Sequence, residues 1–161
     1  VACYRTPGLH AIAVLRLGQW MTRRSLPIKL AVAPLYIFLY SRIRRVWGIE
    51  IPRTTQVGPG LYIGHQGGIF VSHKAVIGAD VNLSQGVAIG EGGSGARRGS
   101  PVIGDHVYIG PGAKVFGRIR VGNNVRIGAN AVVHKDVPDN AVVALAPGFT
   151  IIGSTRDDGD G

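Results

Sequence analysis

The stretch that decides the fold is PVIGDHVYIGPGAKVFGRIRVGNNVRIGANAVV, residues 101–133. An aliphatic residue recurs in it at every sixth position: Ile103, Ile109, Val115, Val121, Ile127 and Val133. The spacing extends backwards through two earlier blocks, whose aliphatic positions are Val57, Ile63 and Ile69, and then Val71, Ile77, Leu83 and Ile89. A fixed period of this kind indicates a repeat architecture. We call these thirteen positions the anchors.

Each six-residue unit is predicted to be one short strand plus one turn, so that three units, about 18 residues, make one triangular rung. The anchor should point inward and stack on the anchor of the next rung. Glycine follows eight of the thirteen anchors, as expected at tight corners where a side chain would clash or φ must be positive. Residues 49–145 then form a parallel β-helix of about four rungs. Hairpins would need a period of two, which is largely absent.

The repeat is interrupted once, by EGGSGARRGSP at residues 91–101. We expect an external loop between two rungs, with Arg97 and Arg98 at its tip. A solenoid that breaks its own register usually does so on its functional face.

The segment before the repeat, residues 1–48, is predicted to be helical. A first helix is expected over 7–23, with Thr6 as cap and Pro7 in the first turn. A second is expected over about 27–46, kinked or split at Pro34 because an interior proline removes a backbone donor. After the repeat, residues 146–161 are expected to form a C-terminal tail.

Charge is concentrated at the N-terminal end of the chain. The formal net charge is +9, and residues 1–50 contain eight Lys or Arg but only one acid, Glu50. This asymmetry fits a solvated helix face or contact with an anionic membrane. Nucleic acid is not expected, because no stacking platform accompanies the basic residues. The apolar run 26–40 is shorter than the roughly 20 residues that cross a bilayer.

The chain has a single cysteine, Cys3, so it cannot form an intrachain disulfide. Nothing in this cysteine usage suggests an oxidising compartment. We therefore expect a cytoplasmic protein, with membrane association as the alternative raised by the basic helices.

Several segments together resemble the serine acetyltransferase family of left-handed β-helix acyltransferases. They are PGLHAIAVLRLGQW (7–20), GIEIP (48–52), GHQGGIFV (64–71), NLSQGVAIG (82–90), PVIGDHVYIGPGAKVFG (101–117) and RIGANAVVHKDVPDNAVV (126–143). The resemblance implies a mainly β fold, a left-handed parallel β-helix after a short helical segment. It also implies an O-acetyltransferase that uses acetyl-CoA as its donor and requires no metal.

The resemblance assigns the catalytic pair to His65 and Glu50. In the family, a histidine is the general base and a carboxylate 15 residues earlier orients it. An imidazole can accept the proton of an attacking hydroxyl near neutral pH, and a carboxylate fixes its tautomer. Zinc chemistry is not expected, because the histidines of the repeat include no close HxxxxH pair.

The resemblance also places CoA in a groove between two coils, which implies a homotrimer with active sites between subunits. Backbone groups at successive corners should hold the pantetheine, and cations should hold the phosphates. The residues that match these roles are Gly90, Gly110, Ala113, Gly128 and Ala131 for pantetheine and Lys114, Arg126 and Lys135 for phosphates.

The sequence departs from the family pattern where the acceptor would bind. The family has an acid just before the catalytic histidine, where this chain has Gly64, and a glutamate eight residues after it, where this chain has His73. The Arg-His pair of the family's loop aligns with Gly99 and Ser100. A site for free serine needs a cation for the carboxylate. We therefore expect the acceptor to be a sugar hydroxyl of a polysaccharide or glycan precursor, bound by His73, Arg97 and Arg98. The alternatives are L-serine itself, as in cysteine biosynthesis, and a non-catalytic scaffold.

Overall fold

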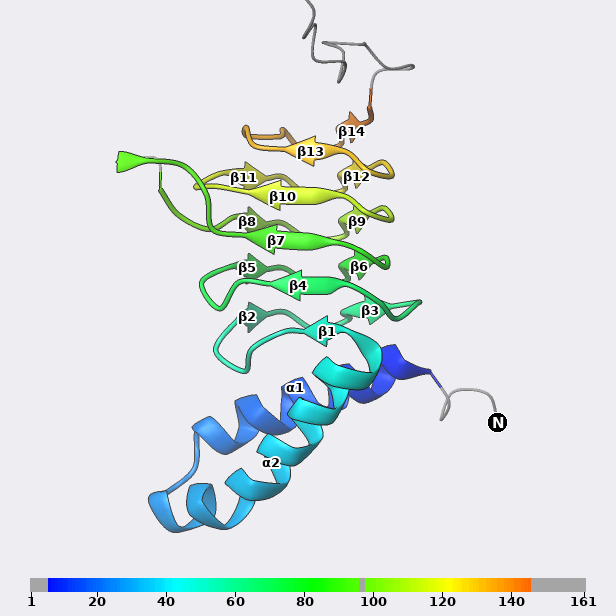
Figure 1. The fold of residues 1–161 in the computed structure, drawn as a ribbon. Coiled ribbons are helices and arrows are strands. Elements are labelled where there is room, and N and C mark those ends of the chain that lie inside the picture. Colours follow the sequence, from blue (N-terminus) through cyan, green and yellow to red (C-terminus); the bar gives the residue numbers. More distant parts are fainter. Residues whose placement is uncertain (1–5, 96–97, 146–161) are drawn as a thin grey trace, which may run out of the picture.

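The computed structural model describes residues 6–95 and 98–145. The predicted Arg97 and the predicted tail over 146–161 lie outside the described residues. Two helices are followed by fourteen short strands that wind into a coil (Figure 1).

The two helices are α1 (Pro7–Thr22) and α2 (Leu26–Trp47). Thr6 occupies the N-cap position of α1 without a side-chain capping hydrogen bond, and proline lies in the first turn. The predicted split at Pro34 was wrong, because α2 continues through the proline as one helix of 22 residues. Buried side chains after Pro34, Tyr36 and Ile43, hold the second half of α2 against the rest of the protein. Gly48, with φ 61°, ends it.

The coil is a left-handed parallel β-helix, as predicted. Its strands are β1 (Ile49–Glu50), β2 (Gln56–Val57), β3 (Tyr62–Ile63), β4 (Ile69–Val71), β5 (Val76–Ile77), β6 (Asn82–Leu83), β7 (Ala88–Gly90), β8 (Val102–Ile103), β9 (Tyr108–Ile109), β10 (Lys114–Phe116), β11 (Arg120–Val121), β12 (Arg126–Ile127), β13 (Val132–Val133) and β14 (Val142–Val143).

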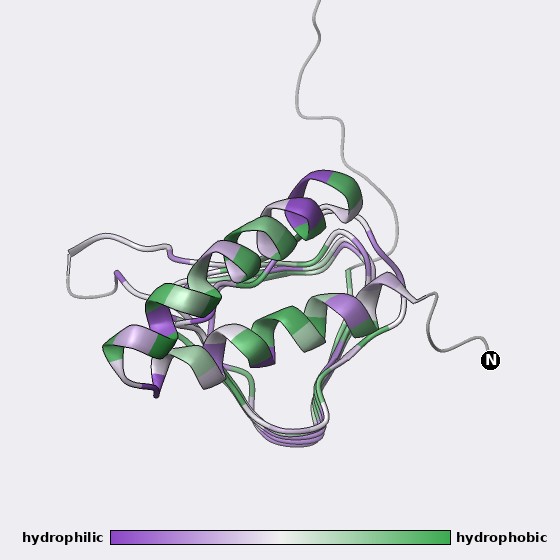
Figure 2. Cartoon of the chain, turned by 90° about the horizontal axis from the view of Figure 1, so that it is seen from below, coloured by the Kyte–Doolittle hydropathy of each residue, from purple (hydrophilic) through white to green (hydrophobic). Residues whose placement is uncertain are grey.

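The strands form three parallel sheets, one for each side of the triangle seen in Figure 2. Sheet A has the order β1-β4-β7-β10-β13, sheet B has β11-β8-β5-β2, and sheet C has β14-β12-β9-β6-β3. The chain passes from A to B to C and back to A in every rung. We name the three columns of turns the A–B, B–C and C–A corners.

Stacked anchors fill the interior of the coil. Twelve of the thirteen are buried, and Val57, in the first rung, is partly buried. Register shows the stacking directly, since Ile109 pairs with Leu83 on one side and Ile127 on the other. Because each rung presents the same aliphatic residues to the next, the core is continuous from β1 to β13.

Two different constraints shape the corners. Gly78 is required by close approach, since a Cβ there would lie 2.6 Å from the carbonyl oxygen of Gly104 in the next rung. Positive φ falls instead two residues later in the same B–C corner, at Asp80, His106, Asn124 and Asn140. His106 is therefore a turn residue in the left-handed conformation, which Asn, Asp and His tolerate better than most residues.

Helix α1 lies across the first end of the coil (Figures 1 and 2). Its buried face contains the small residues Gly8, Ala11 and Gly18, which let it approach closely. A Cβ on Gly8 would overlap the carbonyl of Ile63 in β3. Helix α2 packs on α1 and leads through Gly48 into β1.

Candidate functional site

The predicted base, His65, lies in the C–A corner between β3 and β4, and its side chain is exposed. The turns of this corner stack through backbone hydrogen bonds. The N–H groups of Gly67, Gly86, Gly112 and Asn130 donate to the carbonyls of Trp47, Gly67, Gln85 and Pro111 at 2.7–2.9 Å. His65 therefore stands at the first turn of a regular column that runs the length of the coil.

Most of the predicted CoA residues lie in this same column. Gly110 and Ala113 form one turn of it, Gly128 and Ala131 form the next, and Lys114 and Arg126 flank them. The turn at Gly110 is two rungs from that of His65, about 10 Å at the usual strand spacing. Gly90 and Lys135 are not brought together with them, because Gly90 is the last residue of β7 and Lys135 follows β13, both at the A–B end of the sheet A strands.

The coil already uses much of the backbone predicted to hold pantetheine. The N–H of Ala113 donates to Gly110, its carbonyl accepts from Ala88, and the N–H of Gly110 donates to Ile127. The second lone pair of each carbonyl remains as an acceptor. The N–H groups of Gly110 and Ala113 are therefore already used, and only the two carbonyl oxygens can bind a ligand, as acceptors.

The carboxylate of Glu50 lies at the joint between α2 and the coil. It forms an ion pair with Arg44 of the last turns of α2, with Nη2 and Oε2 3.0 Å apart. Within the described residues no hydrogen bond or ion pair joins Glu50 to His65. A recess of about 430 Å³ opens beside the pair, lined by Ser41, Arg44, Arg45, Gly48, Glu50, Gly68 and Phe70. Gly68 belongs to the turn that carries His65, so the recess reaches toward the predicted base.

Tyr40 shares the surroundings of Glu50. Burial raises the pKa of its phenol to about 12, and the negative charge of Glu50 adds to the effect. Tyr40 is therefore a neutral phenol at physiological pH.

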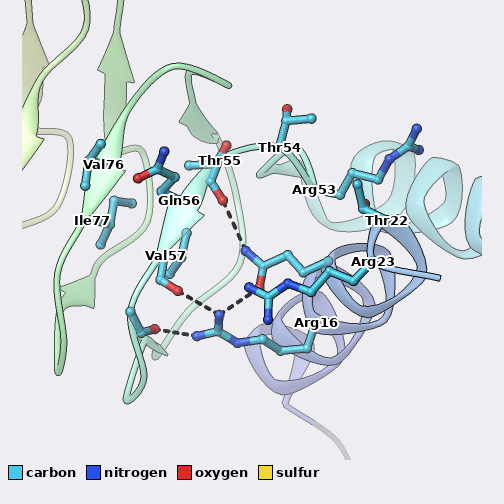
Figure 3. Close-up of a pocket in the computed structure, with 12 residues that line it drawn as sticks. Arg16, Thr22, Arg23, Arg53, Thr54, Thr55, Gln56, Val57, Val76 and Ile77 are labelled. Carbon is cyan, nitrogen blue, oxygen red and sulfur yellow. Dashed lines mark hydrogen bonds between the residues drawn. The ribbon is translucent and has the colours of Figure 1, made fainter.

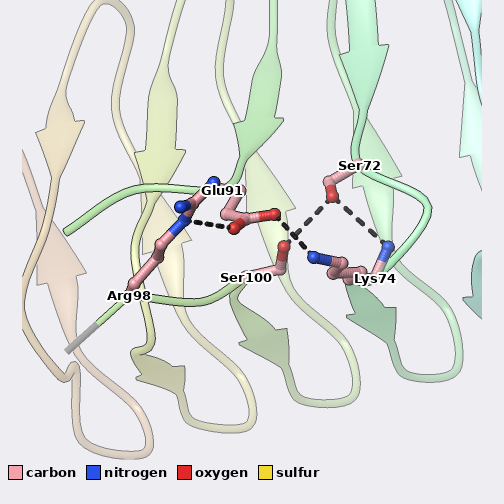
Figure 4. A network of polar contacts seen from close by, with 5 residues as sticks. All are labelled: Ser72, Lys74, Glu91, Arg98 and Ser100. Carbon is pink, nitrogen blue, oxygen red and sulfur yellow. Dashed lines mark hydrogen bonds and ion pairs between the residues drawn. The ribbon is translucent and has the colours of Figure 1, made fainter. Parts of the chain in front are cut away.

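The external loop is fastened to the coil by a small polar network (Figure 4). Glu91 pairs with Lys74 at 3.0 Å and with Arg98 at 2.8 Å. Hydrogen bonds from Lys74, and then from Arg98, hold the pKa of Glu91 below its ordinary value. The hydroxyls of Ser72 and Ser100 lie 3.0 Å apart. Two cations share one anion, so this cluster carries a formal charge of +1.

The predicted acceptor residues lie around this network. His73 is exposed next to Ser72 in the A–B corner, and Arg98 is exposed in the loop. Gly92 and Gly99 close the base of the loop by mutual backbone hydrogen bonds of 3.0 Å. The network therefore stands at the opposite end of the sheet A strands from His65.

A second recess, of about 730 Å³, lies between α1 and the first two rungs and contains none of the predicted site residues (Figure 3). Arg16 donates there to the carbonyls of Val57 and Gly58, and Gln19 donates to the carbonyl of Thr55 at 3.1 Å. These bonds fasten α1 to the coil. The guanidinium of Arg16 therefore has a structural role.

Three residues of these arrangements were missed by the sequence analysis: Arg44, Lys74 and Glu91. Lys74 and Glu91 are 17 residues apart, close to one rung, so the repeat itself could have placed them in neighbouring turns of one corner. Arg44 had no such signal, because its position depends on how α2 meets the coil.

Comparisons with known proteins agree with this architecture. The model of the bacterial transferase hexapeptide family (six repeats) matches residues 100–135. A serine acetyltransferase of Helicobacter pylori strain J99 is 38% identical over 146 residues, which cover 90% of this chain and 81% of that protein. The serine acetyltransferase of Mycobacterium tuberculosis is 37% identical over 151 residues, 94% of this chain and 62% of that protein.

A solved structure adds a likeness in three dimensions. Serine acetyltransferase from Brucella abortus strain S19, in complex with coenzyme A, superposes with a TM-score of 0.72 at 35% identity, over 94% of this chain and 58% of that one. The chain thus spans about three fifths of the length of the M. tuberculosis and B. abortus proteins.

These comparisons correct the expected acceptor. The expectation of a sugar hydroxyl and a role in polysaccharide synthesis was wrong, since the similar proteins are serine acetyltransferases. The error came from reading the loss of an Arg-His pair, at Gly99 and Ser100, as a loss of amino-acid recognition. Cationic side chains remain at the A–B corner, with Arg98 in the loop and Lys74 in the neighbouring turn between β4 and β5.

Proposed function

Because this chain belongs to the serine acetyltransferase family, we propose that it transfers the acetyl group of acetyl-CoA to the side-chain hydroxyl of L-serine. The observation that carries the proposal is the position of His65. It is an exposed imidazole at the first turn of the column that also contains the predicted pantetheine residues Gly110, Ala113, Gly128 and Ala131.

The chemistry follows from this imidazole. His65 accepts the proton of the serine hydroxyl as the oxygen attacks the thioester carbonyl. The tetrahedral intermediate then collapses, the C–S bond breaks, and the CoA sulfur leaves as a thiol after taking up a proton. The products are O-acetylserine and CoA. A positioned general base of this kind typically contributes about 10²- to 10⁴-fold in rate.

Two parts of the proposed site lie at opposite ends of one sheet. His65 precedes β4, whereas His73 follows it and the loop cluster, the polar network of Lys74, Glu91 and Arg98, lies at the same corner as His73. The three residues of β4 that separate the two corners span roughly 10 Å by themselves. The loop cluster, with its formal charge of +1, suits the carboxylate of serine. We propose that the loop of a neighbouring copy closes the site over His65, in a homotrimer with active sites between subunits.

The test is CoA release on mixing the protein with acetyl-CoA and L-serine. His65→Ala should lower kcat by about 10²- to 10⁴-fold without changing the coil. The matched control is His106→Asn, which replaces another exposed histidine by a residue suited to φ 57° and should leave kcat unchanged. Wild-type protein that binds acetyl-CoA but gives no serine-dependent release of CoA would refute the proposed acceptor. Unchanged turnover in His65→Ala would refute the proposed base.

A further inference from the structure

Helix α2 has an apolar surface that no described part of the protein covers. Of its 22 residues, only Tyr36 and Ile43 are buried. It is long and apolar enough to cross a bilayer by length and composition, with a mean hydropathy of 1.4 over its most apolar 18 residues. The helix predicted over about 27–46 is observed as Leu26–Trp47, so the apolar run 26–40 belongs to a helix of 22 residues.

The exposed apolar side chains gather on the outer face of α2 and at its junction with α1. Leu26, Leu30 and Ile37 are spaced by four and seven residues, which places them on one helix face. Together with Trp20 and Phe38 they form what we call the apolar patch, and each of the five is 42–68% exposed. Trp20 is in the last turn of α1, two residues before its end, so it lies near the start of α2.

Cations border this apolar patch on both sides. Arg23 and Arg24 lie at the turn between the helices, Lys29 lies in the first turn of α2, and Arg42 and Arg45 lie near its end. Arg24 stacks on Trp20, with its guanidinium carbon 4.7 Å from the ring centroid. There is no acidic residue from position 1 to position 49. A surface that exposes apolar and basic groups together, without acids, is complementary to a layer of anionic headgroups above acyl chains.

One hollow on the outer face of α2 is also lined by apolar and basic side chains and by no acid. It has a volume of about 690 Å³ and is lined by Pro34, Ile37, Phe38, Ser41, Arg42, Arg45 and Val46. Apolar walls with two arginines beside them suit an acyl chain that carries a phosphate. A second copy of the chain fits less well, because two such faces would place like charges together.

We propose that the α1–α2 hairpin docks on the surface of an anionic phospholipid bilayer. The apolar patch inserts at the boundary between headgroups and acyl chains, while Arg23, Arg24, Arg42 and Arg45 contact lipid phosphates. The helix lies on the bilayer and does not cross it, because Tyr36 and Ile43 are buried against protein. The helices cover the first end of the coil (Figures 1 and 2), whereas His65 is exposed in the C–A corner of the coil itself. This proposal does not depend on the proposed function.

The experiment is flotation of the 161-residue chain with vesicles of phosphatidylcholine alone and with one third phosphatidylglycerol. Binding is expected only with the anionic vesicles and should fall as salt is added. Each cation near the surface contributes about fivefold to partition, so Arg23→Gln/Arg24→Gln should weaken binding roughly 25-fold. Leu26→Glu/Ile37→Glu should abolish it. The matched control is Val142→Glu, at the far end of the coil and 74% exposed, which should bind as wild type.

Circular dichroism checks that every variant keeps the wild-type fold. Two outcomes overturn the proposal. One is wild-type protein that fails to float with anionic vesicles. The other is sedimentation velocity showing that Leu26→Glu/Ile37→Glu dissociates an assembly of copies, without any lipid binding by the wild type, since the patch would then be an interface between chains. Turnover with L-serine is not needed for any of these readouts.

Discussion

Replacing Ile109 by alanine should destabilise the coil strongly. Ile109 is fully buried and lies in register between Leu83 and Ile127, which are buried as well. The substitution removes three carbon groups, worth about 2.4 kcal/mol at about 0.8 kcal/mol each. Rungs above and below hold the surrounding backbone in place, so the cavity collapses little and raises the total to about 3–5 kcal/mol.

The assay is equilibrium unfolding in urea, followed by far-UV circular dichroism at one fixed protein concentration, because association shifts apparent stability. The matched control is Val132→Ala, an outward-facing residue of β13 that is 52% exposed and should change stability by less than about 0.5 kcal/mol. If Ile109→Ala costs less than about 1 kcal/mol at an unchanged m-value, the interior is not packed as tightly as the stacking argument requires.

Three further predictions concern the corners and the site. Gly78→Ala should lower stability by about 1–3 kcal/mol in the same urea assay, because the new Cβ meets the backbone of Gly104, whereas Gly90→Ala, which has nothing within 4 Å, should not. The pKa of Glu91 is lowered in the folded protein, so its ion pairs fasten the loop at any pH above the unfolded pKa of the carboxyl and are lost as the pH falls through the folded pKa. Amide-exchange protection at Gly92 should fall with them. In Glu91→Gln this protection should be low at every pH. Glu50→Gln should lower kcat by about 10²-fold or more and alter its pH profile if Glu50 orients His65 in the assembled enzyme; an unchanged profile would leave Glu50 as a partner of Arg44 alone.

The coil was predictable because every rung repeats one environment. A residue such as Val115 sees the same neighbours as Ile89 or Val133, so the period alone predicts which residues are buried. The role of His65 was inferred from the family resemblance, and the structure shows that its turn shares a column with Gly110 and Gly128.

The contacts that α2 makes with the coil could not be predicted from the sequence, because α2 has no repeat to place its residues. The pairing of Glu50 with Arg44 depends on the direction in which the chain leaves α2 at Gly48 and enters β1. The continuity of α2 through Pro34 depends on packing after the proline, which outweighs the local cost of the missing donor. In both places, side chains far from the repeat decide the local structure.

The stacked turns of the C–A corner are evenly spaced along the coil. Each rung sets the next turn about 4.8 Å further along the coil, so the reach from His65 to the turn at Gly110 is counted in whole coils. A complete rung inserted between them would leave the core intact and both turns correctly shaped, yet would move the imidazole away from the far turn, where we propose that acetyl-CoA binds. The spacing of the two turns is therefore fixed by the number of rungs between them, and a rung added beyond either turn would leave that spacing unchanged.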